Sequence, residues 1–304
     1  MRPNLIIVRA GDESRHAAWL DVGSARSWDM IISYYGDDKG RYRQADIPRF
    51  DAKGAKYPAL TRLLSEQASI IARYDYIWLP DDDLECTGAD IDRLFQICRD
   101  RSLWLAQPAL SADSQFSWAV TLRNPLCRLR FTNFVEIMMP CFERTFLERC
   151  RLSFARSESG WGLDHLWARL AADEQKRIAI IDEVVVAHRR PLSGPWYPFL
   201  KGRSALEERR ELLRVEKIAD RRVRTRALVD RGGRFLSGRS AAAKVLLAAG
   251  LVIALTRSFG LGYANRRCFR TVFKHAFWSS PHVQYLLRMR RRILNRIRGA
   301  GTEA

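Results

Sequence analysis

The segment YDYIWLPDDDLE, residues 74–85, places three consecutive aspartates directly after a short run of apolar and aromatic residues. The run DYIWL (75–79) is typical of a buried strand, whereas buried carboxylates are unfavourable unless they are paired or bound to a metal ion. A divalent cation such as Mg²⁺ or Mn²⁺ prefers oxygen ligands, and one or two carboxylates with substrate phosphates suffice to hold it. The segment therefore predicts a cation site at a strand end; the alternative is a solvated acidic turn that caps a helix.

Strand-like segments alternate with helical ones around these aspartates. The apolar runs 4–11, 28–38, 103–108 and 178–188 predict strands, and Leu and Ile at helical spacing predict a helix over 57–74. A second helix is predicted over 87–98, where Thr87 and Asp90 form a capping-box-like start. This alternation predicts an α/β sandwich with a mostly parallel sheet, in which ligands bind beyond the carboxyl ends of the strands. The aspartates stand at such an end.

The net charge of +18 is distributed unevenly along the 304 residues. Residues 1–200 hold 27 Lys/Arg and 27 Asp/Glu, whereas residues 201–304 hold 25 Lys/Arg and only 7 Asp/Glu. We therefore expect a catalytic domain over 1–200 and a basic, mainly helical region over 201–304. None of the six cysteines forms a CxxC pair and no signal peptide is visible, so we expect reduced thiols in the cytoplasm.

The basic region contains three helix-like stretches. Residues 205–231 are strongly charged, residues 245–255 are apolar throughout, and residues 286–298 interleave arginines with Leu and Ile. The uncharged run of 12 residues (245–256) is shorter than the roughly 20 residues that span a bilayer. Two interpretations remain open: the region docks on an anionic membrane surface at the cytoplasmic face, or it packs on the body with its arginines in solvent.

A second motif, SGWGLDHLW (159–167), joins two glycines, a tryptophan and an acid. The glycines allow close backbone approach to a ligand, and Trp161, followed by Gly162, offers a ring face on which a sugar can sit. Asp164, at the start of a predicted helix, is a candidate general base that deprotonates an acceptor hydroxyl. The alternative is that Asp164 only caps the helix and Trp161 only fills the core.

A third motif, VVVAHRRP (184–191), places His188 at the end of a valine-rich strand. Its imidazole is a candidate metal ligand, and Arg189 and Arg190 are candidate phosphate ligands. A structural histidine is the alternative.

Weaker candidates lie near other predicted strand ends and loops. If the substrate is a nucleotide diphosphate, we expect Arg9 and Asp37 beside its nucleotide, and Lys53 and Lys56 beside its diphosphate. The alternative for each of the four is a surface-loop role. Glu136, one charge among apolar neighbours in FTNFVEIMMPCF (131–142), needs either a core hydrogen-bond partner or an acceptor sugar.

Together, six blocks in order resemble the domain-of-unknown-function 707 family over about residues 3–195: FDAKGAKYPAL, YDYIWLPDDDLE, QPAL, FTNFVEIMMPCF, SGWGLDHLW and IIDEVVVAHRRP. That family is similar to GT-A-type glycosyltransferases, so the resemblance implies a GT-A-like, Rossmann-related α/β/α sandwich. It also implies a DxD motif at Asp81 and Asp83 that holds Mn²⁺ or Mg²⁺, with His188 as a late metal ligand and Asp164 as the acceptor-side acid. Asp82 lies between Asp81 and Asp83, so a motif in which Asp82 and Asp83 are the metal-binding pair stays open.

The resemblance implies a metal-dependent glycosyltransferase that uses a nucleotide-diphospho-sugar, a UDP-sugar by preference, and a glycan or lipid-linked acceptor. Two other classes are kept as alternatives. One is a nucleotide-sugar-binding protein without catalysis. The other is a nucleic-acid-binding protein that uses the basic region, although no helix-turn-helix, zinc or RNP pattern supports it.

Overall fold

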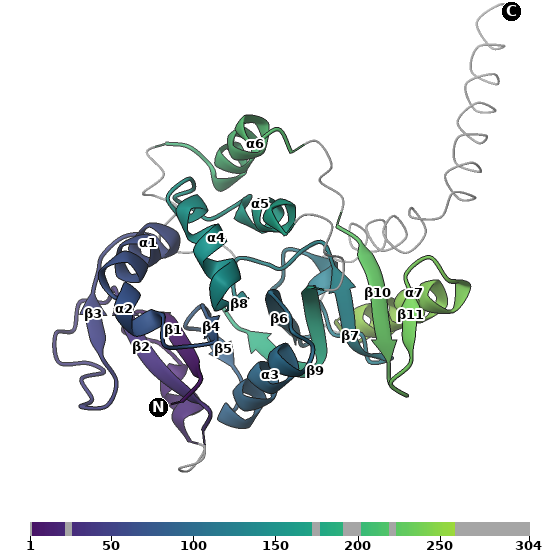
Figure 1. Cartoon of the computed structure of the whole chain (residues 1–304), viewed down its shortest axis with the longest axis horizontal. Helices are drawn as coiled ribbons and strands as arrows, with labels where there is room; N and C mark the ends of the chain where they lie inside the picture. Colours follow the sequence, from purple (N-terminus) through teal and green to yellow (C-terminus); the bar gives the residue numbers. More distant parts are fainter. Residues whose placement is uncertain (1, 22–25, 172–176, 191–201, 219–222, 259–304) are drawn as a thin grey trace, which may run out of the picture.

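The computed structural model describes residues 2–21, 26–171, 177–190, 202–218 and 223–258 (Figure 1). One 11-stranded sheet runs through them in the order β11-β10-β7-β9-β6-β8-β4-β1-β2-β3, with β5 paired to β9. The strands are β1 (Asn4–Ala10), β2 (Trp28–Tyr34), β3 (Arg49–Asp51), β4 (Tyr76–Trp78), β5 (Leu84–Glu85), β6 (Leu105–Leu110), β7 (Cys127–Thr132), β8 (Cys141–Glu143), β9 (Ile178–His188), β10 (Thr225–Asp230) and β11 (Phe235–Ser237). The helices are η1 (His16–Leu20), α1 (Lys56–Glu66), α2 (Ala68–Ile71), α3 (Gly88–Asp100), η3 (Ala119–Thr121), α4 (Arg144–Phe154), α5 (Leu163–Leu170), α6 (Ala205–Val215) and α7 (Ala241–Ser258).

Most strands of the sheet point in one direction. Strands β3, β2, β1 and β4 pair in parallel, as do β6 and β9, while β8 runs antiparallel between β4 and β6. The carboxyl ends of β1, β4 and β9 therefore meet at one edge of the sheet. The predicted α/β fold with a mostly parallel central sheet is confirmed.

Alternate residues of the buried strands enter two separate cores. In β1, Ile6 and Val8 join the core covered by η1 and α3, whereas Leu5 and Ile7 join the core covered by α1, α4 and α5. All seven residues of β1 are buried, as expected for a parallel strand with helices on both faces. The layers are therefore α/β/α.

One of the two predicted helices begins as expected, and the other is divided in two. The Thr87–Asp90 capping box is present at the start of α3, as predicted. The single helix predicted over 57–74 is wrong, because Gln67 leaves the helical region (φ −108°, ψ 23°) and separates α1 from the short α2.

The sheet continues past the predicted boundary at residue 200. Strand β10 pairs antiparallel with β7, and β11 completes a hairpin with β10. The single helix predicted over 205–231 is therefore wrong beyond Val215: α6 ends there, and the buried residues Ala227, Leu228 and Val229 form a strand. The basic stretch 286–298 lies outside the described residues.

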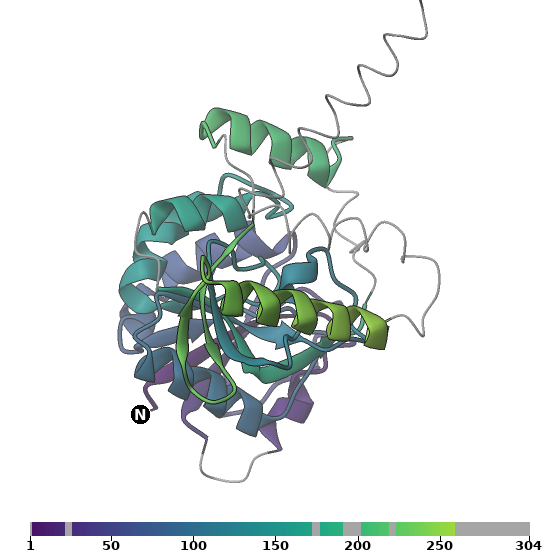
Figure 2. The same cartoon turned by 90° about the vertical axis from the view of Figure 1, so that its right-hand side faces the viewer.

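Helix α7 lies on the outside of the sheet, over the β10–β11 hairpin (Figure 2). Its Leu246 and Leu247 pack against a small core that contains Cys127 and Leu228. The amide of Asn124 fits against Gly250 and donates a 3.1 Å hydrogen bond to the carbonyl of Leu246, while its Oδ1 accepts from Leu126 N at 2.9 Å. No helix of the described part is long and apolar enough to cross a membrane.

We predict that Gly250→Ala lowers stability, although helix propensity alone favours alanine by about 1 kcal/mol. A Cβ at residue 250 would lie 1.9 Å from Asn124 Oδ1, and the two hydrogen bonds of Asn124 prevent it from yielding. The expected loss is roughly 1 to 3 kcal/mol, as for other overpacked sites, and denaturant unfolding measures it. The control Ala248→Gly is expected to lose about 1 kcal/mol through propensity alone. A Gly250→Ala variant more stable than the parent would show that the contact is not tight.

Candidate metal and acceptor site

The pairing of β5 with β9 assembles the first half of the site. Leu84 lies opposite His188, so the short strand that follows the aspartates runs beside the end of β9. The other side of the aspartate loop is fixed by the amide of Asp81, which donates to the carbonyl of Met138 at 2.8 Å. Residues far apart in sequence are thereby held at the same edge of the sheet.

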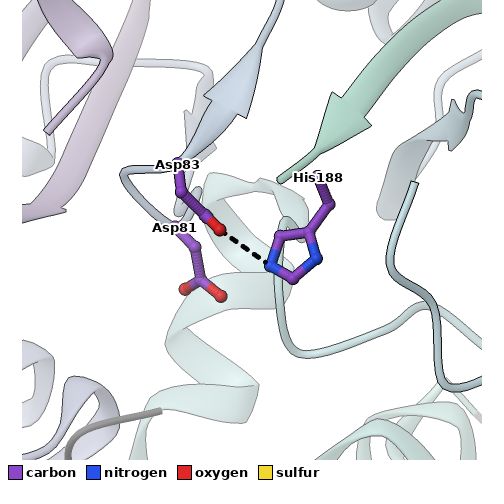
Figure 3. A group of neighbouring side chains, drawn as sticks. All are labelled: Asp81, Asp83 and His188. Atoms are coloured by element: carbon purple, nitrogen blue, oxygen red, sulfur yellow. Dashed lines mark ion pairs between the residues drawn. The ribbon is translucent and has the colours of Figure 1, made fainter. Parts of the chain in front are cut away.

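Asp81, Asp83 and His188 form a group that can hold a metal ion (Figure 3). One ligand atom from each residue lies within 4.8 Å of the others, and Asp83 Oδ2 is 3.1 Å from His188 Nε2. Asp83 and His188 are buried, whereas Asp81 is partly exposed and open to a ligand. Two carboxylates and one imidazole suit a divalent cation with coordination positions left for phosphate oxygens.

The imidazole of His188 is oriented for coordination. Its Nδ1 lies 3.0 Å from the carbonyl of Gln115, and since a carbonyl only accepts, Nδ1 carries the proton of that hydrogen bond. Nε2 is thereby the nitrogen that faces Asp83 and the metal position. A backbone carbonyl on the far nitrogen is the usual partner of a metal-binding histidine.

The charges of the group influence one another strongly. Burial raises the pKa of Asp81 and the negative charge of Asp83 adds to this effect, while Lys56 opposes both. Burial also acts to raise the pKa of Asp83, but the hydrogen bond and charge of His188 outweigh it, and the pKa falls below its usual range. Burial lowers the pKa of His188, yet its contact with Asp83 prevails and raises it. The two carboxylates therefore repel each other, and a bound cation would relieve this repulsion.

Asp82 faces strand β1 instead of this group. Its Oδ2 accepts from the amide of Gly11 at 2.7 Å, and its Oδ1 accepts from Arg190 at 2.7 Å. The structure thus groups Asp81 with Asp83 and His188, and leaves Asp82 to tie the loop to β1. Arg189 and Arg190 pair with carboxylates: Arg189 with Glu85, and Arg190 with Asp82.

Lys56 holds the aspartate loop from the start of α1. Its Nζ donates to Asp81 Oδ1 at 2.7 Å and to the carbonyls of Ile137 and Met138 at 3.1 and 2.9 Å. These acceptors use all three hydrogens of the ammonium group, and burial lowers the pKa of Lys56. Lys56 thus lies beside the group formed by Asp81, Asp83 and His188, and it neutralises part of the Asp81 charge.

Of the other residues expected near a nucleotide, Arg9 is buried, whereas Asp37 and Lys53 are exposed. Arg9 is 4% exposed, and its two terminal nitrogens donate to the carbonyls of Ser33, Ala52 and Gly54. Arg9 therefore ties together the loops around β1, β2 and β3. Asp37, beyond the end of β2, and Lys53, beyond the end of β3, are exposed and form an ion pair at 2.6 Å.

Two further buried carboxylates, Glu136 and Asp164, belong to the same electrostatic site. Burial raises the pKa of Asp164 to about 6, and burial together with the charge of Asp164 raises the pKa of Glu136 to about 8. Glu136 Oε2 is buried, and among the described residues no donor reaches it. The higher pKa of Glu136 favours its protonated form beside an ionised Asp164, a division typical of acid–base sites.

The loop that carries Trp161 packs directly on the start of α1. Gly160 and Gly162 take positive φ values of 80° and 100°, and a Cβ on Gly160 would lie 2.5 Å from the ring of Tyr57. Tyr57 is the neighbour of Lys56 and donates to the carbonyl of Ile137 at 2.6 Å. Gly160 thus brings the loop against the elements that hold Asp81, whereas Gly162 lies against Leu212 and Arg209 of α6. Gly162 is the N-cap of α5, so Asp164 lies inside the first turn and does not cap it.

Helix α6 contributes two residues that the sequence analysis missed. Glu208 accepts from the amides of Glu158 and Ser159 at 2.5 and 2.8 Å and from the hydroxyl of Ser157 at 3.1 Å. Its neighbour Arg209 lies 2.9 Å from His165 Nε2, and its positive charge acts on Asp164. The capping box SALE (204–207) signals the start of α6, but no pattern indicates which loop its Glu208 contacts.

Comparisons with known proteins bear on the family and on the fold of this chain. The sequence matches the family described as "Protein of unknown function (DUF707)" over residues 55–132, which confirms the resemblance in that part of the chain. No curated protein matches the sequence.

Among solved structures, a crystal structure of GalNAc-T7 with UDP, GalNAc and Mn²⁺ is similar over 71% of this chain and 48% of that one, with a TM-score of 0.51 and 11% identity. A structure of S. aureus TarS is similar over 87% of this chain and 45% of that one, with a TM-score of 0.47 and 11% identity. The chain thus aligns with about half the length of either protein. The likeness to GalNAc-T7 shows a fold similar to GT-A-type glycosyltransferases.

We predict that Glu208→Ala loosens the loop at 157–161, because its amides lose the carboxylate that binds them. Hydrogen exchange followed by mass spectrometry is expected to show exchange faster by roughly tenfold or more in peptides of this loop. The matched control Glu211→Ala lies on the same helix, is exposed and pairs only locally with Arg214, so it is expected to leave the loop unchanged. Equal exchange in both variants would mean that α6 does not hold the loop.

Proposed function

We propose that the protein is a divalent-metal-dependent glycosyltransferase that moves a sugar from a nucleotide-diphospho-sugar to a glycan or lipid-linked acceptor. The observation that carries this proposal is the group Asp81, Asp83 and His188 at the carboxyl edge of the sheet, with Asp164 and Glu136 buried beside it. The fold similarity to GalNAc-T7, whose structure contains UDP, GalNAc and Mn²⁺, supports a UDP-sugar as the donor class.

The metal side of the site is assigned to the donor. Asp81, Asp83 and His188 would hold Mn²⁺ or Mg²⁺, which when bound supplies positive charge to the diphosphate leaving group. Lys56 adds a second positive charge at the same place through its contact with Asp81. Asp37 and Lys53, exposed beyond the ends of β2 and β3, are assigned to the nucleotide, and Arg9 and Asp82 fix the loops next to them.

The buried carboxylates are assigned to the acceptor. Asp164 accepts the proton of an acceptor hydroxyl, whose oxygen then forms the bond to the anomeric carbon while the bond to the diphosphate breaks. Trp161 and Gly162 form the loop on which the acceptor sugar rests. Glu136 remains protonated, and its buried oxygen donates a hydrogen bond to an acceptor oxygen.

Removal of a metal ligand is expected to weaken both cation binding and transfer. Asp83→Asn and His188→Gln each remove one of three ligands, so we expect Mn²⁺ affinity, measured by calorimetry or electron paramagnetic resonance, to fall by roughly tenfold or more. The control Glu85→Gln changes a nearby carboxylate that lies outside the group and pairs with Arg189, and it is expected to bind Mn²⁺ as the parent does. Donor turnover is then screened with a panel of nucleotide sugars. Binding of donors without turnover would leave a nucleotide-sugar-binding protein, and Mn²⁺ affinity unchanged in both variants would contradict the metal site.

The pH dependence of transfer is expected to be bell-shaped. Asp164 must be deprotonated to act, so activity should rise with pH through about 6, and Glu136 must be protonated to donate, so activity should fall through about 8. Glu136→Gln keeps a neutral donor at that position and should flatten the alkaline limb, whereas Asp164→Asn should remove nearly all activity. An alkaline limb that persists in Glu136→Gln would rule out this role of Glu136.

A further inference from the structure

Helix α7 has an outward face that is unusual for a helix in contact with water. Between Lys244 and Ser258 its sequence is VLLAAGLVIALTR, so no charged residue lies between Lys244 and Arg257. One side, through Ala243, Leu247 and Gly250, packs on the hairpin and on Asn124. On the opposite side Val245 is 64% exposed and Val252 is 47% exposed. A surface helix normally presents polar residues there, and exposed apolar faces of this kind mark interaction sites.

The surroundings of this face are basic. Residues 225–258 contain six Lys/Arg and one acidic residue, and Arg231, Arg234, Arg239 and Arg257 are all exposed. The chain then continues for 46 residues (259–304) that contain 10 Lys/Arg and one acidic residue. An apolar strip in so basic a part of the sequence complements a surface that is apolar inside and anionic outside.

We propose that the outward face of α7 inserts into the interface of an anionic membrane, with Val245 and Val252 among the acyl chains and the surrounding arginines at the headgroups. Helix α7 then lies in the plane of the membrane, in keeping with the finding that no described helix is long and apolar enough to span one. This inference deepens the proposed function, because a catalytic body held at a membrane surface fits a lipid-linked acceptor.

The attachment of α7 to the sheet makes it a rigid anchor. Asn124, which binds the Leu246 carbonyl, also donates from its backbone amide to Asp182 at 2.7 Å. Asp182 is fully buried in β9 and forms a two-point ion pair with Arg130 at 2.8 Å. Strand β9 ends at His188, so the anchor and the metal group are joined by the same strand.

The test uses the full-length protein and lipid vesicles without metal or nucleotide, so that its result does not depend on the proposed catalytic activity. Flotation is measured with phosphatidylcholine vesicles that do or do not contain about a third phosphatidylglycerol. We expect binding to the anionic vesicles, weaker binding to the neutral ones, and partial release at high salt, since salt screens only the charged contribution.

The double variant Val245→Asp/Val252→Asp is expected to weaken vesicle binding by roughly tenfold or more, because it places two charges in the strip that enters the acyl region. The matched control Leu152→Asp changes the most exposed large apolar side chain of the body, 74% exposed on α4, and should bind as the parent does. Thermal unfolding of both variants checks that they remain folded.

Three results would overturn the proposal. The first is equal vesicle binding by the parent and the double variant. The second is a parent protein that binds neither vesicle. The third is a parent dimer that the double variant converts to monomer without a change in vesicle binding, which would assign the face to a second copy of the chain.

Discussion

The site depends on how three successive carboxylates obtain partners at the end of a buried strand. Each one finds a different partner: Asp82 binds the Gly11 amide and Arg190, Asp81 binds Lys56, and Asp83 faces His188. Because neighbouring aspartates repel, this division turns Asp82 away and leaves Asp81 and Asp83 beside the imidazole. The contact of Asp83 with His188 depends on the pairing of β5 with β9. The strand pairing therefore determines which side chains meet at the site.

The short-range features of the fold could be predicted from the sequence. The strands 4–10, 28–34 and 178–188 are apolar runs with a glycine or charged residues soon after their ends, and the start of α3 follows from its capping box. Two features could not be predicted in this way. The helix break at Gln67 has no glycine or proline to mark it. The strand at 225–230 is stabilised by its pairing with β7, which is a long-range contact. A charged stretch such as 205–231 reads as helix throughout when that partner is unknown.

The candidate site shows the same division. Asp81, Asp83 and His188 could be grouped from the sequence because each follows a strand and such ends share one edge of a parallel sheet. The burial of Arg9 against three carbonyls and the contact of Glu208 with the 157–159 loop could not, because each depends on loops whose course no periodicity encodes. The region after residue 200 has more than one part: α6 holds the 157–159 loop through Glu208, β10 and β11 extend the sheet, and α7 packs on the hairpin.

The central claim is that Asp81, Asp83 and His188 hold a divalent cation that a nucleotide diphosphate also contacts. Anomalous diffraction from crystals grown with Mn²⁺ and UDP tests it most directly. The account predicts one strong manganese peak within bonding distance of these three side chains, with the diphosphate as the next ligand and the Lys56–Asp81 contact retained or lengthened. A manganese peak elsewhere, or UDP bound away from these side chains, would contradict it.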